Sequence, residues 1–196
     1  MSLVIFNFRM KIQKNERKRF CILVTLKNTH LRLGQAEAPI KVEVFLNLAC
    51  PYCASFYELV DGVLLQYINQ NKVELIVKHY DKPREMLLPG GLINLNLDYN
   101  DPVKTLANIN SLFKEQETWD KLSNHGIKEY IEKNYGLKEE EQNIEISLQV
   151  IAEAIERGVK MVPTVFINDI EFQYPREIFT EELTQVLDQQ LSKEKV

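Results

Sequence analysis

The sequence has few cysteines, little net charge and no long apolar run. Its 196 residues include three cysteines and carry a formal net charge of −4. Three cysteines are too few for a disulfide scaffold, and mild acidity without a basic patch argues against nucleic-acid binding. No apolar stretch approaches the roughly 20 residues of a membrane-spanning helix, so we expect no membrane span. Apolar residues make up 45% of the chain, which favours one globular domain, or one domain with a large insertion.

The sequence also lacks the ligand spacing of a metal site. Cys50 and Cys53 form a Cys-x-x-Cys pair, but a closed zinc site needs four ligands and the chain has no second pair. The three histidines are scattered along the chain. We therefore expect no metal and no cofactor. Cys21 is left over, and we interpret it as a small buried hydrophobic residue rather than a reactive thiol.

The cysteine pair lies where a strand is expected to become a helix. Ile40–Leu48 is an apolar run rich in β-branched residues, typical of a buried strand, and apolar residues recur at helical spacing over 56–68. Cys50 then occupies the N-cap and Pro51 the first helical position, where a missing N–H costs nothing. Free backbone N–H groups and the helix dipole stabilise an anion there, which favours the Cys50 thiolate.

This arrangement predicts reversible redox chemistry. Thiols at such positions have pKa values of roughly 3.5 to 7.5 instead of about 8.5, so Cys50 is expected to be nucleophilic near neutral pH. Cys53, one turn further into the helix, should be more buried and should resolve the mixed disulfide. A structural disulfide is the alternative interpretation, but a bridge that closes so short a loop stabilises the fold little.

The N-terminal segment, residues 1–35, combines short apolar runs with a basic stretch over Lys11–Arg19. If translation began at Met10, the order of basic and then apolar residues would resemble a secretory signal with a cleavage site at Ala36–Ala38. The apolar run is too short for that, so we favour a basic arm followed by an edge strand over Phe20–Lys27. This interpretation favours a cytoplasmic location. Export or attachment to the cell envelope is the alternative, if the segment is a signal or an anchor.

A second core strand is expected over Val73–His79, after a helix in which Gly62 is a candidate kink. His79, at the end of this strand, is either a proton-handling residue near the thiols or, as we favour, a histidine satisfied in the core or facing solvent. Pro89–Gly91 is expected to end regular structure.

Residues 101–158 are expected to be helical almost throughout. Asp101 and Pro102 form an N-cap and first-position pair, and Gly136 ends a later helix. A longer helix follows from about Lys138, with apolar residues along one face at Ile144, Leu148, Ile151, Ile155 and Val159. Trp119 is expected in the core of this helical region rather than in the floor of a peptide groove.

The last part of the chain predicts a hairpin and a closing helix. Val162 and Pro163 begin a β-branched apolar run, and the start of a strand is where proline is tolerated. Asn168 and Asp169 then form the turn into a second strand. The closing amphipathic helix is expected over Glu177–Leu191.

Together, the Cys50–Cys53 motif at a strand-to-helix junction and the late Val162-Pro163 pair resemble the thioredoxin fold. The long helical stretch between its two halves resembles the DsbA-like branch of thiol-disulfide oxidoreductases. The resemblance implies an α/β fold with a mixed central sheet, a thioredoxin-like domain over 36–100 and 159–196, and a helical domain inserted at 101–158. It also implies that Pro163 is cis and that the backbone of Val162 binds an extended substrate segment beside Cys50.

The resemblance has departures. Members of the family commonly carry a buried acid six residues before the first cysteine, where this sequence has Val44. Glu43 should point to the opposite face of the strand, because successive side chains alternate. Asn47 also stands where relatives frequently have an acid, so proton handling at Cys53 is left to water.

The middle residues of the motif, Pro51 and Tyr52, influence how far the disulfide is destabilised. Tyr52 replaces the histidine of the strongest oxidants in the family, which favours a moderate potential. The resemblance therefore implies thiol-disulfide exchange by Cys50 and Cys53 with protein or peptide thiols and disulfides, with the oxidase direction favoured and a redox partner that recycles the dithiol. The alternatives are a cytosolic reductase of thioredoxin or glutaredoxin type and a non-catalytic binding module. The glutathione-binding Gly-Gly-Asp pattern of glutaredoxins is missing after the hairpin.

Overall fold

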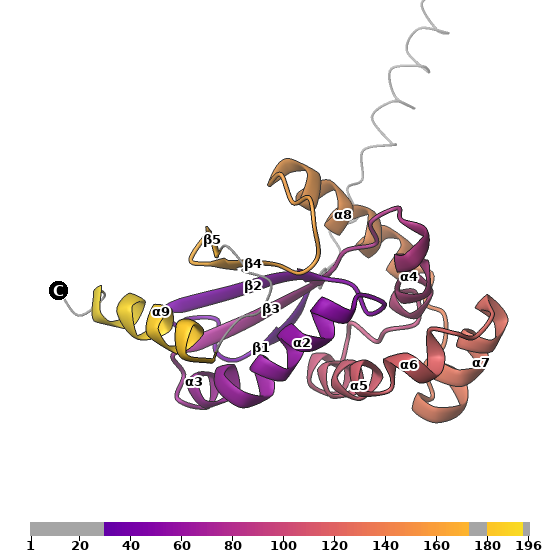
Figure 1. The fold of residues 1–196 in the computed structure, drawn as a ribbon, viewed down its shortest axis with the longest axis horizontal. Coiled ribbons are helices and arrows are strands. Elements are labelled where there is room, and N and C mark those ends of the chain that lie inside the picture. Colours follow the sequence, from indigo (N-terminus) through magenta and orange to yellow (C-terminus); the bar gives the residue numbers. More distant parts are fainter. Residues whose placement is uncertain (1–29, 173–179, 194–196) are drawn as a thin grey trace, which may run out of the picture.

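The computed structural model describes residues 30–172 and 180–193, which fold around one mixed sheet (Figure 1). The five strands described have the order β1-β3-β2-β4-β5. β2 and β3 are parallel, and each of the other neighbouring pairs is antiparallel. The strands are β1 (Leu31–Leu33), β2 (Ile40–Leu46), β3 (Val73–His79), β4 (Thr164–Ile167) and β5 (Ile170–Phe172).

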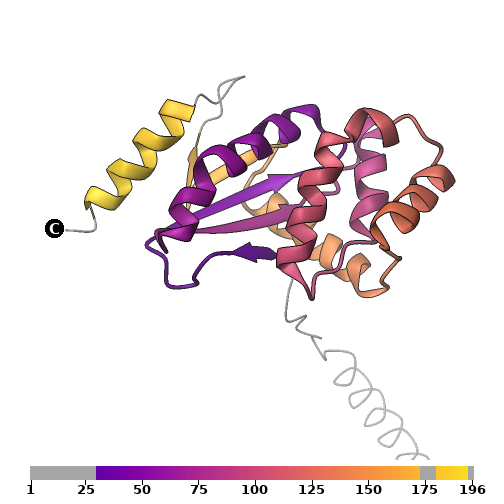
Figure 2. The same ribbon diagram turned by 90° about the horizontal axis from the view of Figure 1, so that it is seen from below.

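A helical crossover joins β2 to β3 and covers one face of the sheet (Figure 2). It consists of α2 (Pro51–Leu59), a π-helical segment η1 (Val60–Leu64) and α3 (Leu65–Asn69). Gly62 lies in the π-helical segment, at the position where the sequence indicates a kink. The closing helix α9 (Thr180–Lys193) packs beside this crossover and buries Leu183 and Leu187. The predicted order of strand, helix, strand, helices, hairpin and helix is therefore confirmed.

The remaining helices lie in sequence between β3 and β4. The predicted caps of α5 and α7 are present: the Asp101 carboxylate accepts the Lys104 N–H at 3.1 Å, and Gly136 adopts a left-handed φ of 67°. Trp119 is fully buried and donates its indole N–H to the Leu112 carbonyl at 2.8 Å. The segments are η2 (Glu85–Leu87), α4 (Leu88–Asn94), α5 (Pro102–Lys114), α6 (Gln116–Trp119), α7 (Asn124–Tyr135) and α8 (Gln142–Glu156).

The expected break at Pro89–Gly91 is wrong, because these residues lie inside α4. Proline is tolerated in the first turn of a helix, where its missing N–H has no partner to lose. Gly90 has a steric role: a Cβ there would clash with the Asn47 side chain and lie 2.7 Å from the Ala49 nitrogen. The glycine thus allows α4 to approach the loop that leads to Cys50.

The apolar face predicted around α8 is confirmed for Ile151 and Val159, which pack in the core, but is wrong for the other three residues. Ile144, Leu148 and Ile155 are 51%, 55% and 69% exposed. The helix is fixed by Asn143, whose side-chain amide donates to three backbone carbonyls of the segment 94–97. The face that packs inward is therefore partly polar, and it consists of Asn143, Ile146, Ser147, Val150 and Ala154.

The edge strand predicted over Phe20–Lys27 lies outside the described residues. The strand that pairs with β3 on its outer side is Leu31–Leu33, which the sequence pattern missed. Within the described residues, no helix is long and apolar enough to cross a membrane.

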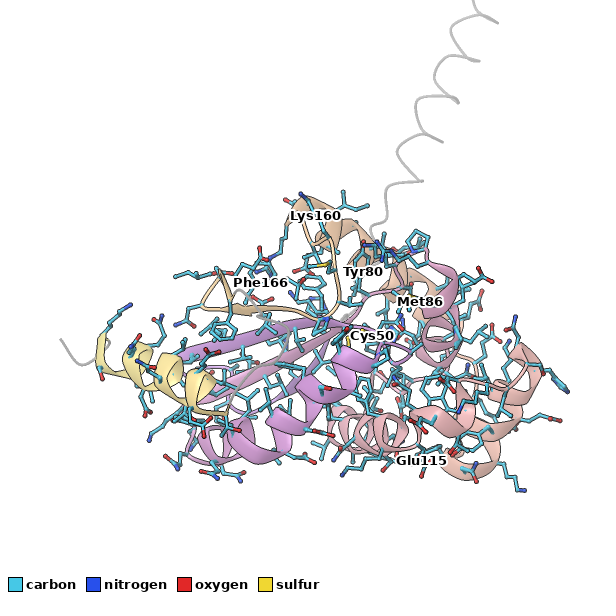
Figure 3. The ribbon with its side chains drawn as sticks, viewed as in Figure 1. Cys50, Tyr80, Met86, Glu115, Lys160 and Phe166 are labelled. Atoms are coloured by element: carbon cyan, nitrogen blue, oxygen red, sulfur yellow. The ribbon has the colours of Figure 1, made fainter. Side chains whose placement is uncertain are left out.

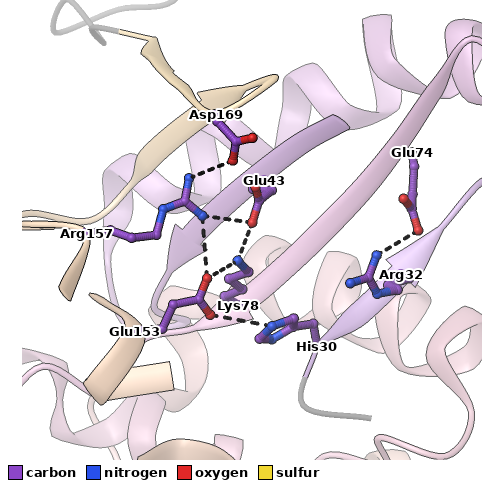
Figure 4. A network of polar contacts seen from close by, with 8 residues as sticks. All are labelled: His30, Arg32, Glu43, Glu74, Lys78, Glu153, Arg157 and Asp169. Atoms are coloured by element: carbon purple, nitrogen blue, oxygen red, sulfur yellow. Dashed lines mark hydrogen bonds and ion pairs between the residues drawn. The ribbon is translucent and has the colours of Figure 1, made fainter. Parts of the chain in front are cut away.

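A network of charged side chains lies between the sheet and α8 (Figure 4). Lys78, on β3, is 3% exposed and donates hydrogen bonds to Glu43 and Glu153. Arg157 binds Glu43 at 3.0 Å and stacks over the Phe166 ring at 3.8 Å from its centroid. Glu43 thus points away from the face of β2 that holds Val44, as the alternation of the strand predicts.

Candidate active site

The two thiols occupy the first turn of α2. Cys50 is the N-cap residue in an extended conformation, with φ −91° and ψ 117°, and Pro51 begins the helix, as predicted. Both cysteines are free thiols. Cys50 is 6% exposed, whereas Cys53 is fully buried and its Sγ accepts the Asn47 N–H at 3.4 Å. The helix geometry therefore places one thiol at the surface of the site and the other behind it.

The surroundings of the two thiols separate their acidities. A hydrogen bond from Cys53 lowers the pKa of Cys50 to about 7, against the opposing effect of burial, and the backbone N–H groups of Cys53 and Tyr52 contribute. Burial raises the pKa of Cys53 well above its usual value, and the neighbouring Cys50 raises it further. At neutral pH Cys50 is partly ionised and Cys53 is protonated. This is the division between an attacking and a resolving thiol.

The fold brings the late proline segment to the thiols. The Cys50 thiol donates to the carbonyl of Val162 at 3.4 Å, across 112 positions of sequence. The Val162–Pro163 peptide bond is cis, and Pro163 is buried. The turn is fixed further by Thr164, whose hydroxyl donates to the Met161 carbonyl at 2.8 Å. The structure thus places the carbonyl of Val162 next to the reactive sulfur, with Pro163 following it in the chain.

A pocket of about 260 Å³ opens beside Cys50. Pro51, Tyr52 and Val162 line it as expected from the motif, and the Tyr52 side chain is 61% exposed. Figure 3 shows Cys50, at the N-terminal end of α2, close to Met86. The rest of the lining was not predicted, and it comes from the loop after β3, from η2 and from the loop before β4: Lys82, Arg84, Met86, Leu87 and Met161.

The sequence matches the family model described as Thioredoxin over residues 26–189. The chain belongs to the thioredoxin family. Among solved structures, it resembles a conserved protein of unknown function from Enterococcus faecalis V583, with 33% identity and a TM-score of 0.76. That alignment covers 83% of this chain and 90% of the other. A search of the curated proteins found no match.

Two further structures share the fold of this thioredoxin-family protein. One is alpha-DsbA1 from Wolbachia pipientis, with 21% identity, a TM-score of 0.69, and coverage of 87% of this chain and 94% of the other. The other is ScsC from Proteus mirabilis, with 21% identity, a TM-score of 0.68, and coverage of 85% and 74%. These likenesses confirm the DsbA-like thioredoxin fold predicted from the sequence.

In this thioredoxin-family protein, three polar side chains hold the loop before Cys50. Asn47 is buried; its amide donates to the Tyr80 carbonyl at 3.2 Å, and its oxygen accepts the Ala49 N–H at 2.9 Å. His79 accepts the Leu48 N–H at 3.1 Å, and Gln116 donates to the Leu48 carbonyl at 2.5 Å. The loop is therefore anchored to the end of β3, to Tyr80 directly after it and to α6.

His79 is satisfied in the core, as we favoured from the sequence. It is 1% exposed, and its second ring nitrogen contacts the Asp81 carboxylate at 2.9 Å. Burial opposes ionisation of Asp81, but contacts with His79, Ser147 and Asn94 outweigh it and hold the pKa of that carboxyl below its usual value. No local pattern indicated this cluster, because its members come from the end of β3 and the loop after it, from α4 and from α8.

The position usually held by a buried acid is apolar here. Val44 is fully buried, and Glu43 lies in the charged network on the other face of β2. Among the residues that the structure describes, no three histidine, cysteine, aspartate or glutamate side chains gather as possible metal ligands. The chemistry of the site therefore rests on the dithiol, the pocket beside it and the backbone of Val162.

Proposed function

We propose that the protein is a thiol-disulfide oxidoreductase that exchanges disulfides with protein clients through Cys50 and Cys53. The observation that carries this proposal is the inequality of the two thiols. Cys50 has a lowered pKa and lines an open pocket, whereas Cys53 is protonated and buried behind it. A structural pair of cysteines has no need of this difference.

The exchange proceeds in two balanced steps. The Cys50 thiolate attacks one sulfur of a client disulfide; a Cys50–client bond forms, and the other client sulfur leaves as a thiolate. Cys53 then loses its proton to water and attacks the Cys50 sulfur, which forms the Cys50–Cys53 disulfide and releases the second client thiolate. The reverse sequence donates the disulfide to a client dithiol, and a redox partner then restores the starting state.

Val162 has a part in both directions. When the Cys50 thiol is protonated, it donates a hydrogen bond to the Val162 carbonyl. A thiolate or a disulfide sulfur has no proton to donate, so the carbonyl is then free to accept a backbone N–H of an extended client segment. Binding of the client backbone is thus coupled to the state of Cys50.

We further propose that the protein donates disulfides, with a moderate potential. Lowering the pKa of Cys50 to about 7 stabilises the reduced form, which is the sign expected of an oxidant. At pH 7 this stabilisation amounts to about half a kilocalorie per mole, on the order of 10 mV for a two-electron couple. The thiolate alone therefore does not make a strong oxidant.

The reduction potential tests the direction. The protein is equilibrated in graded glutathione buffers and its free thiols are counted. A value between about −120 and −200 mV would support disulfide donation and favour a location outside the cytosol. A value near −270 mV would contradict it and support a cytoplasmic reductase.

Trapping tests the exchange itself. Cys53→Ser should accumulate covalent complexes with clients through Cys50, because the resolving thiol is missing. The matched control is the double variant Cys50→Ser, Cys53→Ser, in which these complexes should be absent. If Cys53→Ser traps nothing under mild oxidation and the wild type is inactive, the non-catalytic binding module is the better interpretation.

A further inference from the structure

The pocket beside Cys50 combines an adaptable apolar lining with a positive rim. Met86 and Met161 are 65% and 70% exposed, and both line the pocket with Tyr52. Methionine side chains are flexible and accept apolar groups of many shapes, so this lining selects weakly among clients. Lys82 and Arg84 also line the pocket, and the lining residues that the structure describes include no aspartate or glutamate.

Among the residues that the structure describes, these two cations have no acidic partner. Within residues 30–172 and 180–193, neither Lys82 nor Arg84 forms an ion pair, and Lys82 donates a hydrogen bond to the Lys160 carbonyl. Partial burial and the charge of Arg84 both lower the pKa of Lys82, which shows that the two cations repel each other. By contrast, the buried Lys78 has two glutamate partners.

We propose that Lys82 and Arg84 select client segments with an acidic residue close to the reactive cysteine. The proposal rests on the function proposed above and names the class of client that the same pocket takes. In an extended segment, side chains two positions apart point to the same side and lie about 7 Å apart. A client cysteine bound at Cys50 therefore directs the side chains two positions away toward the same side of the client segment, where the pocket carries the two cations.

The net charge of the protein has the opposite effect on acidic clients to the one proposed for the pocket. The formal net charge is −4, so long-range electrostatics disfavours an acidic peptide. A preference for acidic peptides must then arise from local cations. A client chosen by the methionines alone would show no dependence on charge.

The probes are disulfide-linked dimers of an eight-residue peptide with one cysteine. Three versions carry glutamate, glutamine or lysine at both positions two residues from the cysteine. The reduced protein is mixed with each dimer, and release of the peptide thiol is followed by chromatography. We expect the glutamate peptide to react about fourfold faster than the glutamine peptide, since each exposed ion pair contributes modestly, and the lysine peptide to be slowest. The preference should disappear at about 1 M salt, where charges are screened beyond about 3 Å.

Variants assign the preference to the rim. Lys82→Gln with Arg84→Gln should bring the glutamate-to-glutamine rate ratio close to one, and Arg84→Gln alone, at an exposed position, should about halve it. The matched control is Lys121→Gln, an exposed lysine outside the pocket, which should keep the full ratio. Equal rates for the three peptides, or an acidic preference that persists in the double variant, would overturn the proposal while exchange itself stands. No reaction with any peptide would reject both the selectivity and the proposed function.

Discussion

The ionisable groups near the two faces of β2 differ in whether a ligand can reach them. On one side, the strand leads into Cys50, whose thiol has a lowered pKa and lines an open pocket. On the other side, Glu43 is held in a network with Lys78 and Arg157, in which each charge has a partner. Burial opposes ionisation of Glu43, but these cations outweigh it and keep its pKa below the usual value. A lowered pKa is therefore common to Glu43 and Cys50. What distinguishes Cys50 is the open pocket, through which a ligand can reach it.

The largest effect on stability should come from breaking the charged face. Lys78→Met leaves Glu43 with Arg157 alone and Glu153 with Arg157 and His30, so we expect unfolding to become easier by about 3 kcal/mol. Exchange with a client peptide should keep its rate, because the network does not contact either thiol. Urea unfolding and the peptide assay measure the two quantities.

The matched control for this variant is Lys128→Met, which removes an exposed ion pair with Glu139. It should change stability by less than about 1 kcal/mol. If Lys78→Met slowed exchange as strongly as it destabilised the fold, the two faces would be coupled and the contrast between them would be lost.

The dithiol end was predictable because its signals are local. A buried strand, an N-cap cysteine and a proline in the first turn are adjacent in sequence, and all three were confirmed. The Val162-Pro163 pair was found through family resemblance, and the structure places Val162 on Cys50. The local signals needed no knowledge of which distant segments pack together, whereas the contact of Val162 with Cys50 spans 112 positions and was expected only from the resemblance.

The pocket rim and the orientation of α8 were not predictable in the same way. Lys82 and Arg84 lie in an irregular loop, where no periodicity shows which way a side chain points. The apolar spacing of α8 indicated a face of which three residues are exposed, because polar Asn143 and Ser147 share the inward face with apolar residues. The spacing of apolar residues predicts the buried face of a helix only where apolar burial sets the orientation of that helix. Where polar contacts set it, the prediction fails.

A smaller loss should come from the loop that holds the dithiol. Asn47→Ala removes the partners of the Ala49 N–H and the Tyr80 carbonyl, so we expect a destabilisation of about 2 kcal/mol. Here exchange should also slow, since the loop positions Cys50. Asn134→Ala, which removes an exposed amide that bonds the Tyr130 carbonyl, is the control and should change neither quantity appreciably. If Lys78→Met slowed exchange with the client peptide and Asn47→Ala left its rate unchanged, the contrast between the two faces would be reversed.

The smallest expected effect is a dependence of stability on pH. It distinguishes Cys50, which titrates near neutral pH, from the paired charges around Glu43. The pKa of Cys50 in the folded, reduced protein is about 7, below its ordinary value of 9.0, so the folded state releases this proton at lower pH than the unfolded state. The stabilisation is therefore complete above the ordinary value and is lost as pH falls through about 7. We expect the reduced protein to gain about 1 kcal/mol between pH 6 and pH 8 relative to Cys50→Ser, since all other titrating groups are common to both.

Cys53 does not enter this window, because its raised pKa affects stability only above the ordinary value of 9.0. Urea unfolding of the two reduced proteins at several pH values measures the difference, and alkylation of Cys50 by iodoacetamide should reach half of its maximal rate near pH 7. If the difference in stability stayed constant with pH, Cys50 would not be held as a thiolate. The two faces of β2 would then differ only in access to solvent, and the proposed nucleophile would lose its electrostatic basis.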